Sequence, residues 1–277
     1  FKLIDAELSK LHEQANAKVK RGTYGDNKPA VVATLRTKTM AYELLGVVAE
    51  QDIAVLYDGE SSKGTPVLVK VCRSPANNDL MKAEADLLAK LPADLDPKHT
   101  AYFPNLLDSF EVQNGKTKVR ANVFTAIPGA VSLADVRTAY PKGIDVKDAA
   151  WMWNRLLEAA HLLHVQGFVH ANITPDRFMV VPDTHQGFLT DFCYARKSGQ
   201  TAKAISPAWK PVYPSELTAK KTLDFSTDLF MISHVMNHLL GAKPGSTSVP
   251  AGTPVAIAGL LRSCWLQVFR HGQFSKS

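Results

Sequence analysis

Four polar side chains lie beside apolar stretches of the chain, where they could take part in chemistry. Lys70 ends a strand-like run, and Glu84 lies in the next stretch with helical spacing. Asn172 precedes, and Asp191 follows, a short pair of apolar strand-like runs. A lysine and a glutamate can form an ion pair, and an aspartate can bind a cation, whereas an amide cannot take up a proton near neutral pH. Each signal is weak by itself, so the order of the residues carries the information.

Two histidines and three cysteines are the other candidates for metal binding. His234 and His238 are one helical turn apart, but no acidic residue lies between them as in the zinc-protease motif, so packing or a position on the surface is expected. The cysteines, Cys72, Cys193 and Cys264, are widely separated and odd in number. This pattern argues against a disulfide framework or a zinc site and fits a reducing compartment, so we expect a cytoplasmic protein.

Composition indicates a globular chain. The 277 residues suffice for one large domain or two small lobes, and 45% of them are hydrophobic. No apolar run approaches the roughly 20 residues that cross a bilayer, and no signal peptide precedes Phe1, which we expect to be a processed or engineered boundary. The net charge of +6 is a weak argument for nucleic-acid binding. Four basic residues in one stretch could recruit an acidic partner or be a solvated loop: Arg196, Lys197, Lys203 and Lys210.

The first part of the chain is predicted to be rich in strands. An amphipathic helix is expected over Leu3–Lys20, followed by a loop to Ala30. A main helix is expected over Asp79–Leu91, and the signal Asn114-Gly115 favours a hairpin. The expected strands are Tyr42–Ala49, Ile53–Tyr57, Pro66–Cys72, Leu106–Val112 and Val119–Thr125.

Helical patterns dominate after Pro128-Gly129. A short strand pair, Phe178–Val181 and Gly187–Thr190, and a surface loop over Arg196–Pro214 interrupt them. The expected helices are Asp148–Val165, Leu229–Leu240 and Val255–Phe269.

Eight motifs follow one another in a characteristic order. They are Val67-Leu68-Val69-Lys70, Glu84, Phe103-Pro104-Asn105, Phe124-Thr125-Ala126-Ile127, the stretch from His170 to Arg177, Asp191-Phe192-Cys193, Pro214-Ser215-Glu216 and Asp228. The series resembles that of the protein kinases, from Tyr42 to Gly241. The resemblance implies an ion pair of Lys70 with Glu84 that fixes ATP phosphates. The alternative, that this pair only ties a helix to the sheet, stays open.

The same resemblance implies that much of the catalytic loop is altered. Asn172 stands where the family has its catalytic aspartate, and Arg177 stands at the second metal ligand. Thr174 replaces the catalytic-loop lysine, and Ala171 replaces the arginine that grips a phosphorylated activation loop. Asp191 is then the remaining candidate ligand for Mg²⁺.

The implied nucleotide site is altered as well. Its expected lining is Lys70, Leu68, Ala49, Gln51, Ala54, Phe124, Ala126, Arg177 and Met179. Ala49, Gln51 and Ala54 stand at the three glycine positions of the phosphate-covering loop. An added Cβ there hinders close approach of the backbone to the phosphates. Leu68 stands above the adenine position and Phe124 is the gatekeeper. ATP and Mg²⁺ are thus the candidate cofactors, and these substitutions argue against both.

We therefore expect an α+β, bilobal, protein-kinase-like fold. Residues 1–41 would be an N-terminal helix and extension, 42–127 a small antiparallel-sheet lobe with one main helix, and 128–277 a mostly helical lobe shortened at its end. The expected function is that of a catalytically impaired pseudokinase acting as a scaffold or allosteric module for a protein partner, without membrane or nucleic-acid binding. The alternative is an active phosphotransferase or nucleotidyltransferase that uses a non-standard set of residues.

Overall fold

The computed structural model describes residues 30–219 and 222–271, and the side chains of Glu216, Thr218 and residues 266–271 are not among them. The described chain divides into two compact units, with the boundary between Ala130 and Val131. We call residues 30–130 the sheet unit and residues 131–271 the helical unit. The helix predicted over Leu3–Lys20 lies outside the described residues.

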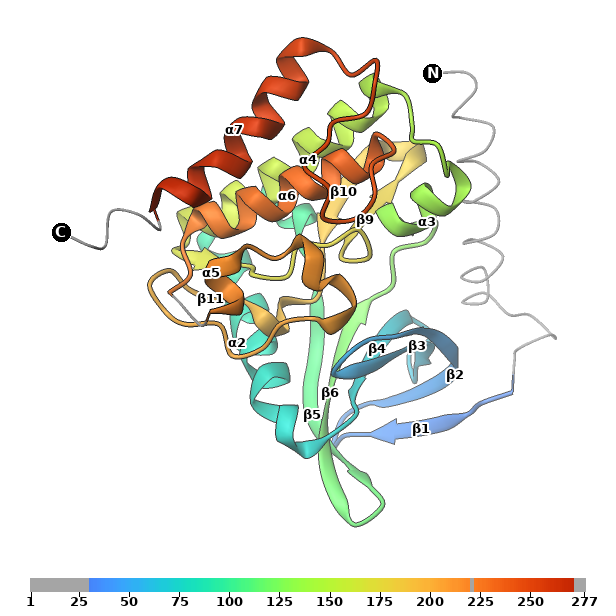
Figure 1. Cartoon of the computed structure of the whole chain (residues 1–277). Coiled ribbons are helices and arrows are strands. Elements are labelled where there is room, and N and C mark those ends of the chain that lie inside the picture. The colour runs from blue at the N-terminus through green and yellow to red at the C-terminus, as the bar shows by residue number, and fades with distance from the viewer. Residues whose placement is uncertain (1–29, 220–221, 272–277) are drawn as a thin grey trace. The chain divides into compact units, whose positions relative to one another are not determined.

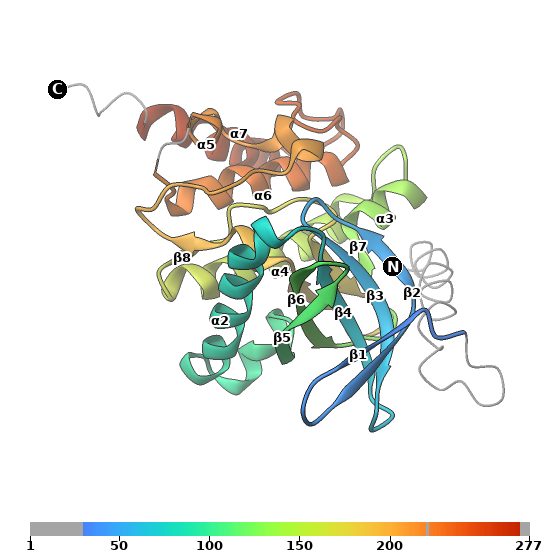
Figure 2. The same ribbon diagram turned by 90° about the horizontal axis from the view of Figure 1, so that it is seen from below.

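The sheet unit is built on a six-stranded antiparallel sheet in the order β1-β2-β3-β4-β6-β5 (Figure 2). The strands are β1 (Ala33–Arg36), β2 (Ala41–Glu50), β3 (Ala54–Ser61), β4 (Pro66–Cys72), β5 (Leu106–Asn114) and β6 (Thr117–Thr125). Its one long helix, α2 (Asn78–Asp94), packs on β5 and β6. The short 3-10 helices η3 (Pro75–Asn77) and η4 (Pro97–Tyr102) flank this helix.

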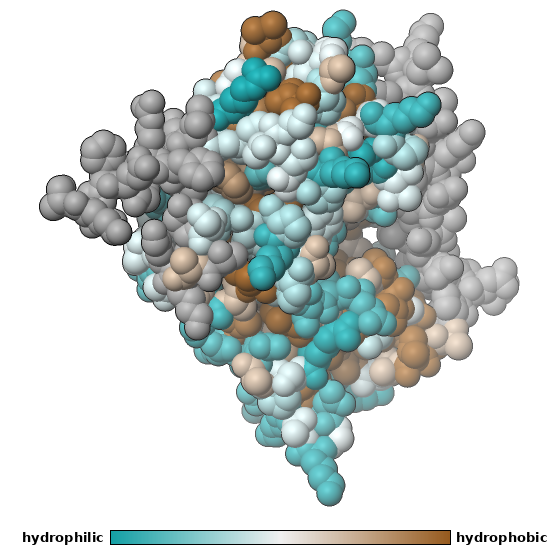
Figure 3. Space-filling model, viewed as in Figure 1, coloured by the Kyte–Doolittle hydropathy of each residue, from teal (hydrophilic) through white to brown (hydrophobic). Residues whose placement is uncertain are grey.

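Alternation along the strands produces the core of this sheet. Val67 and Val69 on β4 point to one face and join Tyr42, Leu44 and Val123 in a buried cluster. Lys70 follows in the same strand, and its side chain is also buried. At the β5–β6 turn Gly115 takes a φ of 58°, a left-handed conformation that glycine adopts easily. Hydrophilic side chains cover the tip of this hairpin (Figure 3).

The helical unit is built on three long helices that lie side by side (Figure 1). They are α4 (Val146–Val165), α6 (Phe225–Leu239) and α7 (Val255–His271), and two shorter helices are α3 (Leu133–Ala139) and α5 (Ser215–Thr218). The strands are β7 (Val131–Ser132), β8 (Phe168–Val169), β9 (Phe178–Val181), β10 (Gln186–Leu189) and β11 (Arg196–Lys197). They form a three-stranded sheet, β10-β9-β7, and the pair β11-β8. The 3-10 helices are η5 (Pro182–Thr184), η6 (Phe192–Tyr194) and η7 (Pro207–Val212).

Side-chain caps fix where the helices of this unit begin. The Asp145 carboxylate accepts from the backbone N–H of Lys147 at the start of α4, and Asp224 does the same for Ser226 at the start of α6. Ser132 and Asp135 form a reciprocal capping box at α3. Such caps stabilise each helix by about 1 kcal/mol and define its first turn.

The observed fold is α+β with antiparallel sheets, as the sequence patterns predict. The pattern did not reveal β1 or α3, which are short. The stretch predicted as a surface loop over Arg196–Pro214 instead contains β11 and η7, and its Ser206 and Tyr213 are buried. Among the described residues, no helix combines the length and apolar character needed to cross a bilayer.

His234 on α6 is buried between aromatic rings. It contacts Phe230 edge-on, with ring centroids 4.6 Å apart, and stacks on Trp265 of α7 at 5.5 Å. Burial lowers the pKa of His234 to about 4, so the folded unit favours the neutral imidazole. Of the two roles left open for this histidine, packing is the one that agrees with its burial.

We predict that the protein becomes less stable as the pH falls from about 6.5 toward 4, because the unfolded chain takes up a proton at His234 that the folded unit resists. Above pH 6.5 or so the imidazole is neutral in both states, and this stabilisation is complete. The variant His234→Phe keeps an aromatic ring and removes the titration. Its melting temperature, followed by circular dichroism, should fall less over this pH interval than that of the wild type; equal decreases would contradict the prediction.

Candidate functional site

Lys70 and Glu84 form a buried ion pair in the sheet unit. The ammonium of Lys70, on β4, lies 2.9 Å and 3.1 Å from the two carboxylate oxygens of Glu84, on α2. Their side chains are 3% and 1% exposed. Desolvated charges of this kind persist only when both are well paired, so the contact ties the helix firmly to the sheet.

A third residue, Asn122, fixes this ion pair. It lies on β6 directly opposite Lys70, and its side-chain amide donates to Glu84 Oε2 and to the carbonyl of Met81, both at 2.9 Å. Its carbonyl oxygen accepts from Ser109 Oγ at 2.8 Å. Asn122 is fully buried. One amide therefore holds both the side chain of Glu84 and the backbone of α2 against the sheet. No sequence motif pointed to Asn122. Its role in holding the ion pair is seen only from its position opposite Lys70 and from its hydrogen bonds.

The residues expected at the glycine positions lie at the tight β2–β3 connection. Ala49 is on β2, Ala54 begins β3 and is buried, and the backbone N–H of Gln51 donates to the Ala54 carbonyl. The side-chain oxygen of Gln51 is buried and has no hydrogen-bond partner among the described residues. The neighbouring Glu50 pairs with Arg73 at 2.6 Å.

Leu68 and Phe124 face each other across neighbouring strands, β4 and β6. Phe124 is buried and Leu68 half-buried, while Ala126 follows the end of β6 and donates to the Pro66 carbonyl. Met179, the remaining expected contact, is half-buried on β9 of the helical unit. The structure therefore groups most of this expected set in the sheet unit.

In the helical unit, Asp228 on α6 organises the loop that follows β8. Its carboxylate accepts from the backbone N–H groups of His170 and Ala171 at 2.8 Å and 2.9 Å, and from His164 Nε2 at 2.8 Å. Ala171 has a φ of 59°, which is strained for alanine. The bond to Asp228 holds it there.

His170 is fully buried, and burial favours its neutral form. Desolvation lowers its pKa, an effect larger than the opposing attraction of Asp228. Its Nδ1 accepts from the backbone N–H of Asn172 at 3.3 Å, and its Nε2 lies 3.0 Å from the Thr190 carbonyl. The neutral ring protonated on Nε2 satisfies both contacts. Its edge-to-face contact with Phe192 at 4.8 Å makes it part of the core.

Both atoms of the Asn172 amide are engaged inside the helical unit. Its oxygen accepts from the Tyr213 hydroxyl at 2.5 Å, and its nitrogen donates to Asp191 Oδ2 at 3.4 Å. The Tyr213 oxygen in turn accepts from the backbone N–H of Ser206 at 3.0 Å. Asn172 is 0% exposed. The residue at the expected catalytic position is therefore a link between the loop and the segment that precedes α5.

Arg177 forms a buried ion pair with the expected metal ligand. Its Nε lies 2.5 Å from Asp191 Oδ2, and its NH1 also contacts Asp176. Arg177 and Asp191 are 4% and 5% exposed. Thr174, at the expected lysine position, donates to Asp176 at 2.6 Å. The guanidinium thus contacts Oδ2, one of the two carboxylate oxygens that a metal could use, and its positive charge there does not fit an adjacent Mg²⁺ ion.

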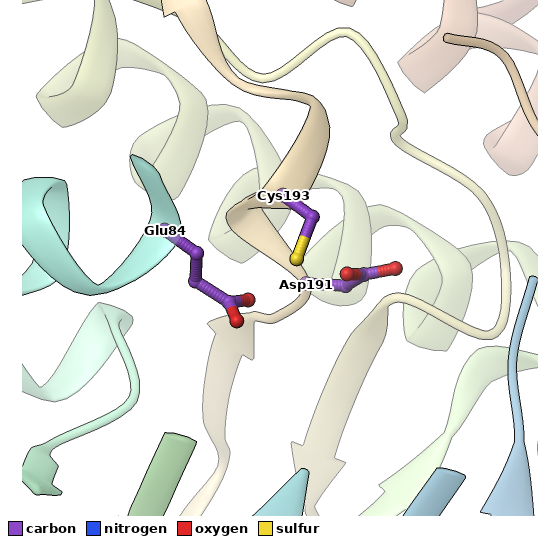
Figure 4. A group of neighbouring side chains, drawn as sticks. All are labelled: Glu84, Asp191 and Cys193. Atoms are coloured by element: carbon purple, nitrogen blue, oxygen red, sulfur yellow. The ribbon is translucent and has the colours of Figure 1, made fainter. Parts of the chain in front are cut away.

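Asp191 also has strained backbone, with a φ of 63°. It and the buried Cys193 belong to the segment after β10, whereas Glu84 belongs to α2 of the sheet unit (Figure 4). Each unit therefore contains a polar group of its own. One contains Lys70 and Glu84, and the other contains Asn172, Arg177 and Asp191. Tyr213, which completes the second group, had no motif of its own.

A scan against protein-family models and a search of curated proteins both found no match to this chain.

We predict that Asn122→Leu destabilises the sheet unit by about 1–3 kcal/mol, because Glu84 and the Met81 carbonyl lose a buried donor. Chemical denaturation monitored by circular dichroism would measure this loss. Asn105→Ala is a matched control, since the Asn105 amide donates to Thr125 Oγ1 on the surface. Its cost should stay within about 0.5 kcal/mol. Equal costs for the two variants would contradict the role assigned to Asn122.

We predict that Tyr213→Phe loosens the segment around Ser206, because it removes the donor to Asn172 and the acceptor for the Ser206 N–H. Amide hydrogen exchange at residues 206–213 should rise by about tenfold or more, as expected for the loss of 1–3 kcal/mol of local stability. Tyr42→Phe is a suitable control, since it removes a tyrosine hydrogen bond to Asp108 in the sheet unit. Unchanged exchange at 206–213 in Tyr213→Phe would rule out the anchoring role.

Proposed function

We propose that this chain is a catalytically impaired, protein-kinase-like pseudokinase that acts through binding, as a scaffold or allosteric module for a protein partner. The sheet unit would correspond to the small lobe of such a protein and the helical unit to the large lobe. The observation that carries the proposal is the buried network of Asn172, Arg177 and Asp191, which engages the side chains that would supply the base and the metal ligands for phosphoryl transfer.

The first supporting argument concerns the base. A group that orients and deprotonates an attacking hydroxyl must accept a hydrogen bond and a proton. The Asn172 oxygen already accepts from Tyr213, and an amide does not take up the proton. Loss of the base alone leaves some rate from positioning, so the second argument is needed.

The second argument concerns the metal. Phosphoryl transfer from ATP relies on Mg²⁺ to neutralise the phosphate charge. A cation that bound Asp191 Oδ2 would compete with the Arg177 guanidinium, which lies 2.5 Å from that oxygen. The two positive charges would repel each other in the interior, and this repulsion opposes Mg²⁺ binding. Arg177 itself supplies the positive charge there and lends no support to a magnesium site.

The Lys70–Glu84 pair favours a structural role over a catalytic one. Asn122 holds Glu84 without help from a nucleotide, and the Lys70 side chain is only 3% exposed. The sequence left two roles for this pair, fixing ATP phosphates or tying the helix to the sheet. The contacts with the protein's own side chains are sufficient for the second role. A fold kept rigid by internal polar contacts of this kind is suited to presenting surfaces to another protein.

The proposal predicts no phosphate or nucleotide transfer that depends on Lys70. Purified protein would be incubated with Mg²⁺ and ATP labelled either at the γ-phosphate or at the α-phosphate, with a mixture of protein substrates. Incorporation should equal that of Lys70→Ala in both cases. A thermal-shift measurement with ATP and Mg²⁺ should show no stabilisation of the wild type, since only a ligand that binds the folded state raises the melting temperature.

The two labels separate the alternatives. Lys70-dependent transfer of the γ-phosphate would establish an active phosphotransferase, and Lys70-dependent transfer of the α-phosphate a nucleotidyltransferase. Either result would overturn the proposal. The double variant Asn172→Asp with Arg177→Asn restores the kinase pattern at these two positions. If Mg²⁺ and ATP raise the melting temperature of this variant and not that of the wild type, these two residues are the cause of the weak binding of ATP and Mg²⁺ by the wild type.

A further inference from the structure

The positive charge of the chain is concentrated in one segment. Residues 196–221 contain six lysines and arginines and one glutamate, a net charge of +5 out of +6 for the whole chain. The rest of the protein is therefore almost neutral. A solvated surface usually mixes both signs, so a run of this kind is a departure that needs an explanation.

From Arg196 to Ala219 the segment belongs to the helical unit and contains β11, η7 and α5 (Figure 1). At its start β11 pairs with β8, and the backbone of Gly199 and Gln200 then bonds to Leu223. Further along, the Tyr213 hydroxyl joins Ser206 to Asn172. In an active kinase a phosphate gripped by an arginine can order this part of the chain. Here buried neutral hydrogen bonds do so.

Between these anchors the segment exposes cations and an aromatic ring. Lys197, Lys203 and Lys210 are exposed, as are the residues on either side of Trp209 in η7. Within the described part of the chain, Lys197 and Lys210 form no ion pair. Trp209 is half-buried and lies edge-on to His238, with centroids 6.3 Å apart. Tryptophan beside basic residues is a common composition at the centre of protein interfaces.

We propose that the segment of Lys197, Lys203, Trp209 and Lys210 is a docking surface for an acidic protein segment. The proposal rests on the proposed function, since it names the chemical class of partner for a module that acts by binding. Ordering by Tyr213 and Asn172 means that little conformational entropy is lost when the partner binds. The charge complementarity is with carboxylates, which the lysines can approach as exposed point charges.

An acidic peptide fits this surface better than a nucleic acid does. Binding to a phosphate backbone uses many cations spread along a groove or face. Here the excess charge is confined to one short segment, and the remainder of the chain contributes only +1. Half-burial of Trp209 also restricts stacking with bases, whereas an apolar side chain between acidic residues can contact its edge.

Fluorescence anisotropy would test the surface with a labelled peptide of glutamate, aspartate and serine that contains one leucine. The triple variant Lys197→Gln, Lys203→Gln, Lys210→Gln should bind this peptide roughly tenfold more weakly, as expected for three exposed charge pairs. Replacing the same lysines by arginine should retain binding. The matched control is Lys63→Gln, Lys116→Gln, Lys142→Gln, which removes the same charge at exposed positions elsewhere and should leave binding nearly unchanged.

Three outcomes would overturn the inference. They are no binding of the peptide by the wild type, equal losses in the two triple glutamine variants, and tighter binding of a single-stranded oligothymidine than of the peptide at the same ionic strength. Because all substituted lysines are exposed, melting temperatures should be unchanged and would verify folding. The transfer assay tests the pseudokinase proposal separately: turnover would defeat that proposal whatever the peptide does, and absent peptide binding without turnover would defeat only this surface.

Discussion

The ion pair between Arg177 and Asp191 is the interaction on which the helical unit's polar centre depends. Two opposite charges are buried at 2.5 Å, and neither could remain there alone. Asn172 donates to the same carboxylate oxygen and thereby connects the pair to Tyr213. A guanidinium has a fixed charge and a fixed planar geometry, so it occupies this position permanently, unlike a metal that binds and leaves with nucleotide.

This pair has a consequence for the segment before α5. With a carboxylate at position 172, a second negative charge would lie beside Asp191, and each would raise the energy of the other. The amide avoids this repulsion and offers an acceptor to Tyr213 at the same time. An amide at position 172 therefore adds no negative charge beside Asp191 and still offers an acceptor to the Tyr213 hydroxyl, so the segment is fastened by a neutral hydrogen bond.

Much of the fold followed from residue patterns, but the links between elements did not. The strand-like run from Pro66 to Cys72 identified β4, and the helical spacing from Leu80 to Leu91 identified most of α2. Asn122 and Tyr213 could not be found in this way, because each acts through a partner far away in the sequence and neither belongs to a periodic pattern. Arg177 was noticed as a charge at an unexpected position, while its pairing with Asp191 required the positions of both side chains.

The two polar networks both pair their buried charges internally, and the helical unit also carries exposed lysines on one segment. In the sheet unit Asn122 donates to Glu84 and to the backbone of α2, so the protein's own side chains hold this helix in position. In the helical unit Arg177 and Asp191 neutralise each other in the interior, whereas the exposed lysines lie on a segment that Tyr213 anchors. The buried charges are paired with each other, whereas the excess positive charge is at the surface. The lysines of this segment can therefore attract an acidic group from solution. This distribution of charge is the basis of our proposal that the segment recognises an acidic protein partner.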